Sequence, residues 1–406
     1  MNRTEQRVDE PHRSTALSLF EQALQIFNGW TDPDTGARVL RLHARNVPHT
    51  PGMWRTFYHQ FHPFLHSGQT VLLHTKKLYA DADGPATYAL NLATGEATNR
   101  IPDGYHVTDV MDKTQFALLN FKEADGIRIV LWDLRAGREL SSVYPDGWKY
   151  NVCAFLSDGR RALVFYFRGK PYDEPVQSRF YLLEPGEPAR LVYDVDGYFC
   201  SHLVGHPTDP NLYSFDRWPS PMRPIVQAIT LRTVDGSFEE PLKLDAQAMR
   251  SGDTWGCRDH YLWTPDGARV ISYLCPHPID LGPGFNHFKL EWWLSALDWR
   301  TGEDLAARYP RGRFGGHMAV TPDSRYAVCC GGSGFDNLFA VEIEGLRQGW
   351  NEHIICAYPH NDSKGTNADP HPQPFVLPDG SGVIFNAGWH GDDYGVYLAE
   401  WPATLK

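Results

Sequence analysis

One short turn recurs along the chain, and its spacing constrains the fold more than any other feature of the sequence. Each copy is an x-Pro-Asp-Gly turn or a variant of it, and a β-branched, apolar run of residues follows. Glycine and aspartate suit such turns, because glycine tolerates positive φ. The seven copies, of which the second and fourth are weaker, lie near Gly68, Lys113, Gly159, Asn211, Gly267, Ser324 and Gly380.

A second landmark follows these turns, namely a strand that ends in a Thr-Gly-like hairpin. Examples are Tyr88–Ala97, Val130–Glu139 and Trp293–Asp304, in which apolar and polar residues alternate as in strands. Four short strands in a repeat of about 50 residues are typical of a β-propeller blade. The sequence therefore predicts an all-β, seven-bladed β-propeller. A pair of β-sandwiches and a β-helix are competing interpretations that fit the seven-fold spacing less well.

The two ends of the chain predict how the ring closes. The last repeat stops after the strand Tyr394–Trp401, and a matching strand lies in Asp34–Ala44. We expect the N-terminal strand to complete the seventh blade, which removes exposed sheet edges. The predicted domains are an N-terminal extension over residues 1–28, with a short helix, and a propeller over residues 29–406.

Charge and composition exclude several classes of function. The formal net charge is −11, from 49 acidic and 38 basic residues, whereas nucleic-acid binding needs a basic face. The chain shows neither a secretory signal nor a membrane-length apolar run, so we expect no membrane partner and a cytoplasmic location. The seven cysteines show no Cys-x-x-Cys spacing and predict buried thiols in a reducing compartment.

Three histidines precede three successive turns by six to nine residues. They are His260 in DHYLWTPDG, His317 in GGHMAVTPD and His371 in DPHPQPFVLPDG. In a propeller, the loops that lead into the innermost strands converge at one mouth of the central channel. We therefore expect these imidazoles to meet in space, although the 18 histidines of the chain make some chance alignment easy.

Four segments, in order, resemble the oligogalacturonate lyases, a family of seven-bladed propellers that cleave uronate oligosaccharides by β-elimination with bound manganese. GHPTDPNLYSF (Gly205–Phe215) resembles the family's Gly-His-Pro…Asp-Pro stretch, and HYLWTPDG (His260–Gly267) resembles its His-Glu-Phe-Trp-x-Pro-Asp-Gly. HMAVTPD (His317–Asp323) resembles His-Phe-x-Ser-Asn-x-Asp. HNDSKGTNADPHPQPFVLPDG (His360–Gly380) resembles His-Asp-x-Ser…His-Pro-His-Pro-Ser-Phe-x-Pro-Asp.

This resemblance implies roles for particular residues. The family's catalytic base falls on His260, and its metal histidines fall on His317 and His371. Its remaining metal histidine and its glutamine ligand are replaced by Asp369 and Thr366. Aspartate oxygen suits manganese and also calcium or magnesium, so the implied cofactor is a divalent metal, with manganese favoured.

The family's catalytic arginine has no clear counterpart. The aligned position is Gln227, and FDRWP (Phe215–Pro219) replaces the family's Cys-His-Glu-Gly-Pro. We assign Arg217 as the candidate catalytic arginine, and Arg223 and Gln227 as candidate substrate contacts. This departure leaves open which uronate the chain would accept.

Two further residues are candidate substrate contacts. His62 lies six residues before the first turn glycine, and Trp389 could stack on a sugar face. His206 is interpreted as a structural residue that supports the HPTDP turn.

Elimination at a uronate removes the weakly acidic proton at C5 and expels the O4 substituent. It needs a base, for which a neutral histidine is suited, and a cation that neutralises the carboxylate. We therefore predict a lyase acting on an acidic oligosaccharide, with its oligomeric state left open. A hydrolase with two carboxylates is one alternative, with Asp259, Asp369, Asp392 and Asp393 as candidates. A non-catalytic interaction platform is the other.

Overall fold

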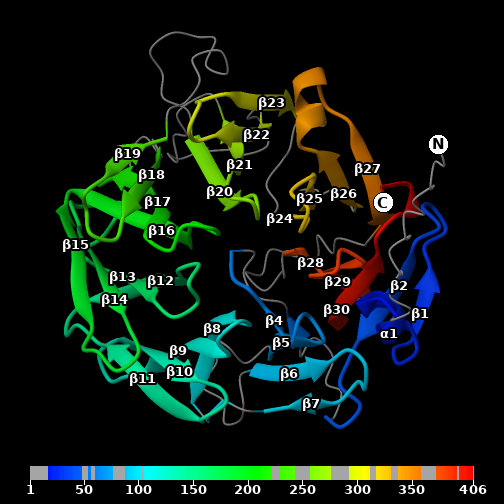
Figure 1. The fold of residues 1–406 in the computed structure, drawn as a ribbon, viewed down its shortest axis with the longest axis horizontal. Coiled ribbons are helices and arrows are strands. Elements are labelled where there is room, and N and C mark those ends of the chain that lie inside the picture. The colour runs from blue at the N-terminus through cyan, green and yellow to red at the C-terminus, as the bar shows by residue number, and fades with distance from the viewer. Residues whose placement is uncertain are drawn as a thin grey trace, which may run out of the picture.

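Seven small antiparallel sheets form a closed ring in this computed structural model (Figure 1). The prediction of a seven-bladed β-propeller is therefore confirmed, and each sheet is one blade. The structure describes residues 17–47, 54–55, 60–75, 87–99, 101–102, 104–221, 228–242, 257–275, 292–310, 317–330, 337–357, 372–390 and 393–405. No helix in these ranges is long and apolar enough to cross a membrane.

Within each blade the strands run outward from the centre, with neighbours hydrogen-bonded to each other (Figure 1). The innermost strands of blades 1 to 7 are β4 (Phe64–Leu65), β8 (Tyr105–Met111), β12 (Lys149–Phe155), β16 (Tyr198–Gly205), β20 (Cys257–Trp263), β24 (Met318–Val320) and β28 (Phe375–Val376). The second strands are β5 (Thr70–Thr75), β9 (Phe116–Lys122), β13 (Ala162–Arg168), β17 (Leu212–Pro219), β21 (Arg269–Cys275), β25 (Tyr326–Cys330) and β29 (Gly382–His390).

The outer half of each blade is built in the same way. The third strands are β6 (Thr87–Asn91), β10 (Ile127–Asp133), β14 (Gln177–Leu183), β18 (Ala228–Thr233), β22 (Trp293–Asp298), β26 (Asn337–Glu342) and β30 (Asp393–Glu400). The fourth strands are β7 (Ala97–Thr98), β11 (Arg138–Val143), β15 (Arg190–Asp196), β19 (Glu239–Pro241), β23 (Asp304–Arg308), β27 (Glu352–Ala357) and β2 (Arg38–Leu42). Three further pieces are β3 (Trp54–Arg55), which pairs with β5, and the short helices η3 (Glu344–Gln348) and η4 (Ala403–Leu405).

The recurrent turns join the first and second strands of the blades. The residue that ends the turn has a positive φ in five of them, including Ser324 at 62° and Gly267 at 71°. A side chain at Gly267 is excluded as well by space, because a Cβ there would lie 2.5 Å from the His206 ring of the preceding blade. Glycine is therefore required at position 267 both by the backbone geometry of the turn and by the contact with the preceding blade.

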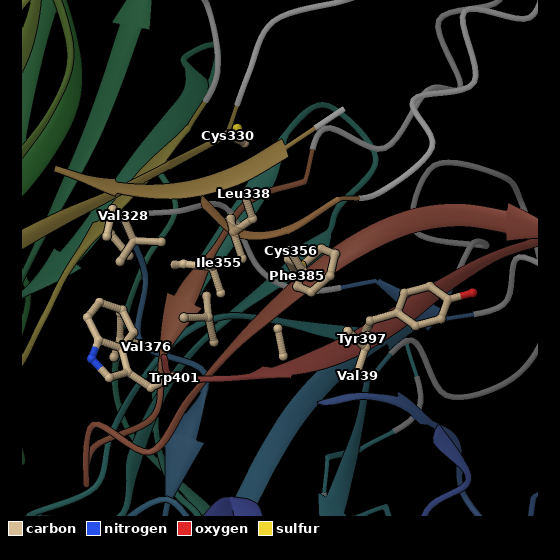
Figure 2. Packing of buried hydrophobic residues seen from close by; sticks show 14 of the residues in the cluster. Val39, Val328, Cys330, Leu338, Ile355, Cys356, Val376, Phe385, Tyr397 and Trp401 are labelled. Carbon is tan, nitrogen blue, oxygen red and sulfur yellow. The ribbon is translucent and has the colours of Figure 1, made fainter. Parts of the chain in front are cut away.

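The N-terminal strand closes the ring as expected. Strand β2 pairs antiparallel with β30, placing Val39 opposite Ala399 and Leu42 opposite Val396. A fifth strand, β1 (Gly29–Thr31), adds to the outside of β2 and was not predicted. Closure also buries an apolar seam, in which Val39 and Tyr397 of blade 7 pack with Val328 and Ile355 of blade 6 (Figure 2).

A short helix, α1 (Leu19–Leu24), precedes these strands, as the sequence predicts. Ser18 and Glu21 form a capping box at its start. The Leu19 amide donates to Asp379 Oδ2 at 2.7 Å, and the Phe20 amide donates to Ser381 Oγ at 3.1 Å. Both acceptors belong to the recurrent turn of blade 7. The helix is thus fixed against blades 7 and 1, while the domain boundary at residue 28 stays a prediction.

We expect Leu40→Ala to lower the free energy of unfolding by about 2–5 kcal/mol, because it removes a fully buried side chain from the closing strand. Leu40 is 1% exposed and lies opposite Leu398 in the closing pair. Leu191→Ala is the matched control, since Leu191 is 44% exposed on β15 and its change should stay within about 0.5 kcal/mol. Denaturant titration of both variants checks this, and equal losses would contradict a closing role for β2.

Candidate functional site

Four successive blades present a side chain at the same place relative to the turn that follows. In each, one backbone amide closes the turn by donating to a carbonyl at the start of the second strand. These amides belong to His206, Thr264, Thr321 and Leu377. Counting back four residues from each amide gives the equivalent positions in blades 4 to 7, which hold His202, His260, His317 and Gln373.

Three of these four residues have a backbone that L-amino acids rarely adopt. The φ angle is 45° at His202, 48° at His260 and 45° at Gln373. In blades 4 and 5 the cause is a β-bulge, where two residues of the innermost strand lie opposite one residue of the second strand. His202 and His260 are each the first of the two. Such a backbone costs about 1–3 kcal/mol and persists only where the surrounding structure holds it, often at functional sites.

Three imidazoles lie in a row at the inner edge of blades 4, 5 and 6, and two of them are carried by the bulges. The ring centroids of His202 and His260 lie 5.2 Å apart, and those of His260 and His317 lie 5.1 Å apart. His317 is 4% exposed, and its backbone amide donates to Cys330 Sγ of β25. Two of the three histidines expected to meet therefore do so.

His202 was missed by the sequence reasoning. It lies nine residues before the landmark Asn211, whereas His260 lies seven before Gly267, because the turn of blade 4 is longer. A count from the first residue of the turn, which is His206, gives the same spacing of four residues. The sequence signal that could have identified His202 is thus the spacing of the two histidines in the SHLVGHP stretch.

His202 is held by contacts from two elements. Its Nδ1 donates to Asp216 Oδ2 in a very short hydrogen bond from β17, and Asp216 is fully buried. The hydroxyl of Tyr261 in the next blade donates to the His202 carbonyl at 2.5 Å. Burial raises the pKa of Tyr261 well above its ordinary value, so this hydroxyl stays protonated as a donor.

The segment that leads into β4 crosses the ring. Gln60 Nε2 donates to the carbonyl of Tyr261 in blade 5 at 3.1 Å, while the His62 amide donates to Asp109 Oδ1 in blade 2 at 2.8 Å. Blades 2 and 5 lie on opposite sides of the ring, so this segment passes through the central channel (Figure 1). It connects to the bulge of His260 through the neighbouring residue, Tyr261.

His62 presents its ring to solvent within this crossing. Its side chain is 69% exposed, and its Nδ1 lies 3.5 Å from Asp109 Oδ1. Partial loss of hydration lowers the pKa of His62, but the hydrogen bond with Asp109 and the charge of its carboxylate outweigh this and raise the pKa. His62 is thus a candidate positive group in the channel, and its contact with an anionic substrate stays a prediction.

Arg217 is not brought beside the three histidines. Its guanidinium lies 3.1 Å from Glu239 and 3.9 Å from the ring centre of Tyr198. Arg217 follows Asp216 directly on β17, and successive side chains of a strand point to opposite faces. Since Asp216 faces His202, Arg217 faces away from it.

Several predicted site residues lie outside what the structure describes. Arg223 and Gln227, and the metal candidates Thr366, Asp369 and His371, belong to undescribed segments. The same holds for the side chains of Trp389 and of the hydrolase candidates Asp259 and Asp393, and for Asp392. In blade 7 the position equivalent to His317 is Gln373, two residues after His371.

His317 has the chemistry expected of a metal ligand. Neutral imidazole is a common ligand of transition metals, and His317 is buried beside a second imidazole. Among the described residues, no group of three or more histidine, cysteine, aspartate or glutamate side chains is arranged to hold a metal ion. His317 therefore fits the predicted site as one ligand, and the other three predicted ligands are those outside the described residues.

His206 has the structural role predicted for it. Its Nδ1 accepts from the amides of Thr208 at 3.3 Å and Asp209 at 3.0 Å, and its Nε2 donates to the Gly267 carbonyl of blade 5 at 3.1 Å. Such a ring must be neutral, since Nδ1 acts as an acceptor. Burial lowers the pKa of His206, although the Gly267 carbonyl acts in the opposite sense.

We expect His206→Ala to lower the free energy of unfolding at pH 8 by about 1–3 kcal/mol, through its lost hydrogen bonds. The folded pKa lies below the unfolded value of about 6.5, so the contribution is complete above pH 6.5 and is lost as pH falls below it. The stability gap between wild type and variant should therefore narrow in acid. Denaturant titration between pH 5 and pH 8 checks this, and a constant gap would contradict a neutral, structural His206.

Two solved structures with a similar fold are oligogalacturonate lyases. One, in complex with manganese, is 20% identical with a TM-score of 0.70, and the alignment covers 93% of this chain and 97% of the other. The second, from Vibrio parahaemolyticus, is 18% identical with a TM-score of 0.70, covering 94% and 98%.

The β-propeller domain of Cps50 (Swd1) from Myceliophteria thermophila is more distant. It is 10% identical with a TM-score of 0.50, covering 88% of this chain and 99% of that domain. No protein-family model matches the sequence, and neither does the sequence of any curated protein. The comparisons establish a fold shared with oligogalacturonate lyases over nearly the whole chain.

Proposed function

We propose that this chain is a lyase that cleaves uronate-containing oligosaccharides by metal-assisted β-elimination. The observation that supports it most is the row of His202, His260 and His317 at the inner edge of three successive blades. The shared fold of the two oligogalacturonate lyases supports the same reaction class. The departures around Phe215–Pro219 argue against transferring the substrate of those enzymes directly.

His260 is the proposed base that removes the C5 proton. It lies between the other two imidazoles, and its bulged backbone is held from the adjacent residue by Gln60. A neutral imidazole can accept a proton at neutral pH if it is within hydrogen-bond reach of the substrate. The position of His260 between an Asp216-bound histidine and a candidate metal ligand suits a base that acts between two positive groups.

His317 is the proposed metal ligand of the described residues, with Asp369, His371 and Thr366 as its proposed partners. When bound, a divalent ion, manganese before calcium or magnesium, neutralises the uronate carboxylate and lowers the barrier to loss of the C5 proton. A local positive group is needed here, because a chain with a net charge of −11 does not attract an anionic sugar by its overall field.

A glycoside hydrolase is the second candidate, and it needs two carboxyl groups flanking the scissile bond. The buried carboxylates Asp109 and Asp216 contact His62 and His202, respectively. The four aspartates first considered for this role have side chains outside the described residues. The two carboxylates described beside the channel histidines are thus each engaged with an imidazole, which favours elimination over a pair of free carboxyl groups.

The remaining proposals concern setting and partners. We place the protein in the cytoplasm, since the described cysteine side chains are buried and form no disulfide. Its proposed partner is an acidic oligosaccharide, and we propose neither a nucleic acid nor a membrane as a partner. Its oligomeric state is open. The alternative of a non-catalytic platform gives no reason for two strained histidines side by side.

An ultraviolet assay on a panel of uronate oligosaccharides, with metal analysis of the same protein, tests the proposal. Elimination leaves a conjugated C4–C5 double bond that absorbs in the ultraviolet, and we expect this product to form. We also expect a bound divalent ion, whose removal by a chelator abolishes turnover and whose return as manganese restores it. Protein that holds no metal and forms no unsaturated product with any uronate would contradict the proposal.

A further inference from the structure

His202 has a role beyond those assigned so far, and the first indication is its local geometry. His202 has a left-handed backbone, and its ring is hydrogen-bonded to a fully buried carboxylate, that of Asp216. Its carbonyl accepts a hydrogen bond from the Tyr261 hydroxyl. Its side chain remains 16% exposed. The ring is therefore held in one place and is still partly accessible.

Asp216 determines the protonation of that ring. A buried carboxylate is costly unless it is paired, and it accepts the Nδ1 proton of His202. Nδ1–H then stays with Asp216, and the carboxylate favours a second proton on Nε2. The described contacts of His202 also include the His260 ring and the Tyr261 hydroxyl, both from β20.

Two adjacent imidazoles in unequal surroundings suit opposite tasks. His202 has a buried anion beside it, whereas His260 has His202 on one side and His317 on the other. Pairs of groups whose environments differ in this way identify the acid and the base of a reaction.

We propose that His202, held by Asp216, is the proton donor to the leaving oxygen in the reaction that His260 begins. This inference rests on the proposed lyase function. His260 takes the C5 proton, the C–H electron pair forms the C4–C5 double bond, and the C4–O4 bond breaks. The departing O4 takes the proton from His202 Nε2, which leaves His202 neutral and His260 protonated. Proton exchange with water restores both, so no other reactant is required.

The spacing of the two rings suits this division. C5 and the carbon that carries O4 are neighbours, so the proton removed and the oxygen protonated lie on adjacent parts of one sugar. Rings with centroids 5.2 Å apart can reach both through their edges. Within the described ranges the nearby arginines are engaged elsewhere, Arg217 with Glu239 and Arg258 with Asp304.

Replacing His202 with glutamine tests the proposal, if two leaving groups are compared. With a sugar at O4, we expect His202→Gln to lower turnover by about two to four orders of magnitude, the usual loss for a positioned acid. With a nitrophenyl group at O4, the leaving group is nitrophenolate, which departs without a proton. The turnover of the variant should then be within about tenfold of the wild-type turnover. His260→Ala should be slow with both substrates. His353→Gln, on the outermost strand β27, is the matched control and should behave as wild type with both.

Asp216→Asn should reproduce the leaving-group dependence of His202→Gln, because it removes the anion that favours the proton on His202. Histidine-selective NMR of the resting enzyme gives a readout without turnover. His202 should be doubly protonated at neutral pH in wild type and should lose a proton in Asp216→Asn, with thermal unfolding confirming that the variant is folded.

The outcomes separate this proposal from the function on which it rests. Wild type that forms no unsaturated product overturns the lyase function and this inference with it. An active wild type overturns the inference alone if His202→Gln keeps full turnover with the sugar, or is equally slow with both leaving groups. A singly protonated His202 in the wild-type NMR spectrum at neutral pH also overturns it.

Discussion

Replacing His260 with alanine is expected to lower the turnover of uronate oligosaccharides by about two to four orders of magnitude, the range for loss of a positioned general base. The physical reason is its place between His202 and His317, with ring centroids 5.2 Å and 5.1 Å away. Initial rates of ultraviolet absorbance at saturating substrate measure the effect. Metal content and unfolding temperature should match wild type.

His260→Asn is the control that separates the ring from the backbone. Asparagine tolerates the left-handed region better than most residues, so it should keep the backbone at φ 48° without strain. We expect this variant to be as inactive as His260→Ala and at least as stable. If either variant forms the unsaturated product at a rate near wild type, His260 is not the base.

Arg258→Met is expected to lower the free energy of unfolding by about 3–5 kcal/mol, because it leaves a buried charge without its partner. Arg258 and Asp304 are each 1% exposed and form a very short ion pair between β20 and β23. Arg258 Nη1 also donates to Ser272 Oγ at 2.9 Å and Ser295 Oγ at 2.6 Å, which links all four strands of blade 5.

A double substitution shows whether the unpaired charge causes the loss. Arg258→Met with Asp304→Leu removes both charges, and we expect it to recover most of the stability, since apolar replacements of buried pairs are often neutral. Denaturant titration of the two single variants and the double variant forms the cycle. A double variant as unstable as the sum of the single variants would contradict the ion-pair explanation.

Most of the fold could be predicted because the turns repeat. A tight turn needs residues that accept positive φ, so five of the seven blades leave a readable mark such as Gly159 or Gly380. The closing strand could be predicted because a ring needs four strands in every blade, and the last repeat had three. Strand β1 has only three residues, Gly29–Thr31, too few to show an alternating pattern.

The candidate site was predictable only in part, because bulges and turn lengths set its register. His260 and His317 each lie seven residues before the landmark of their turn, Gly267 and Ser324, so their positions could be compared along the sequence. His202 precedes a longer turn, and Asp216 reaches it from the neighbouring strand through pairing that spacing along the chain does not reveal. Arg217 directly follows Asp216 on β17, and successive side chains of a strand point to opposite faces, so Arg217 faces away from His202. The distance of Arg217 from a sequence motif does not show on which face of the strand it lies.

Digestion of a uronate oligosaccharide in water enriched in ¹⁸O, followed by mass spectrometry of both fragments, tests the central claim most directly. Elimination makes the new double bond without using water, so the account predicts two fragments without ¹⁸O in the newly formed ends. The fragment with the double bond should be lighter by one water than its hydrolytic counterpart. Incorporation of one ¹⁸O at the cleaved linkage, with no unsaturated fragment, would show a hydrolase and contradict the account.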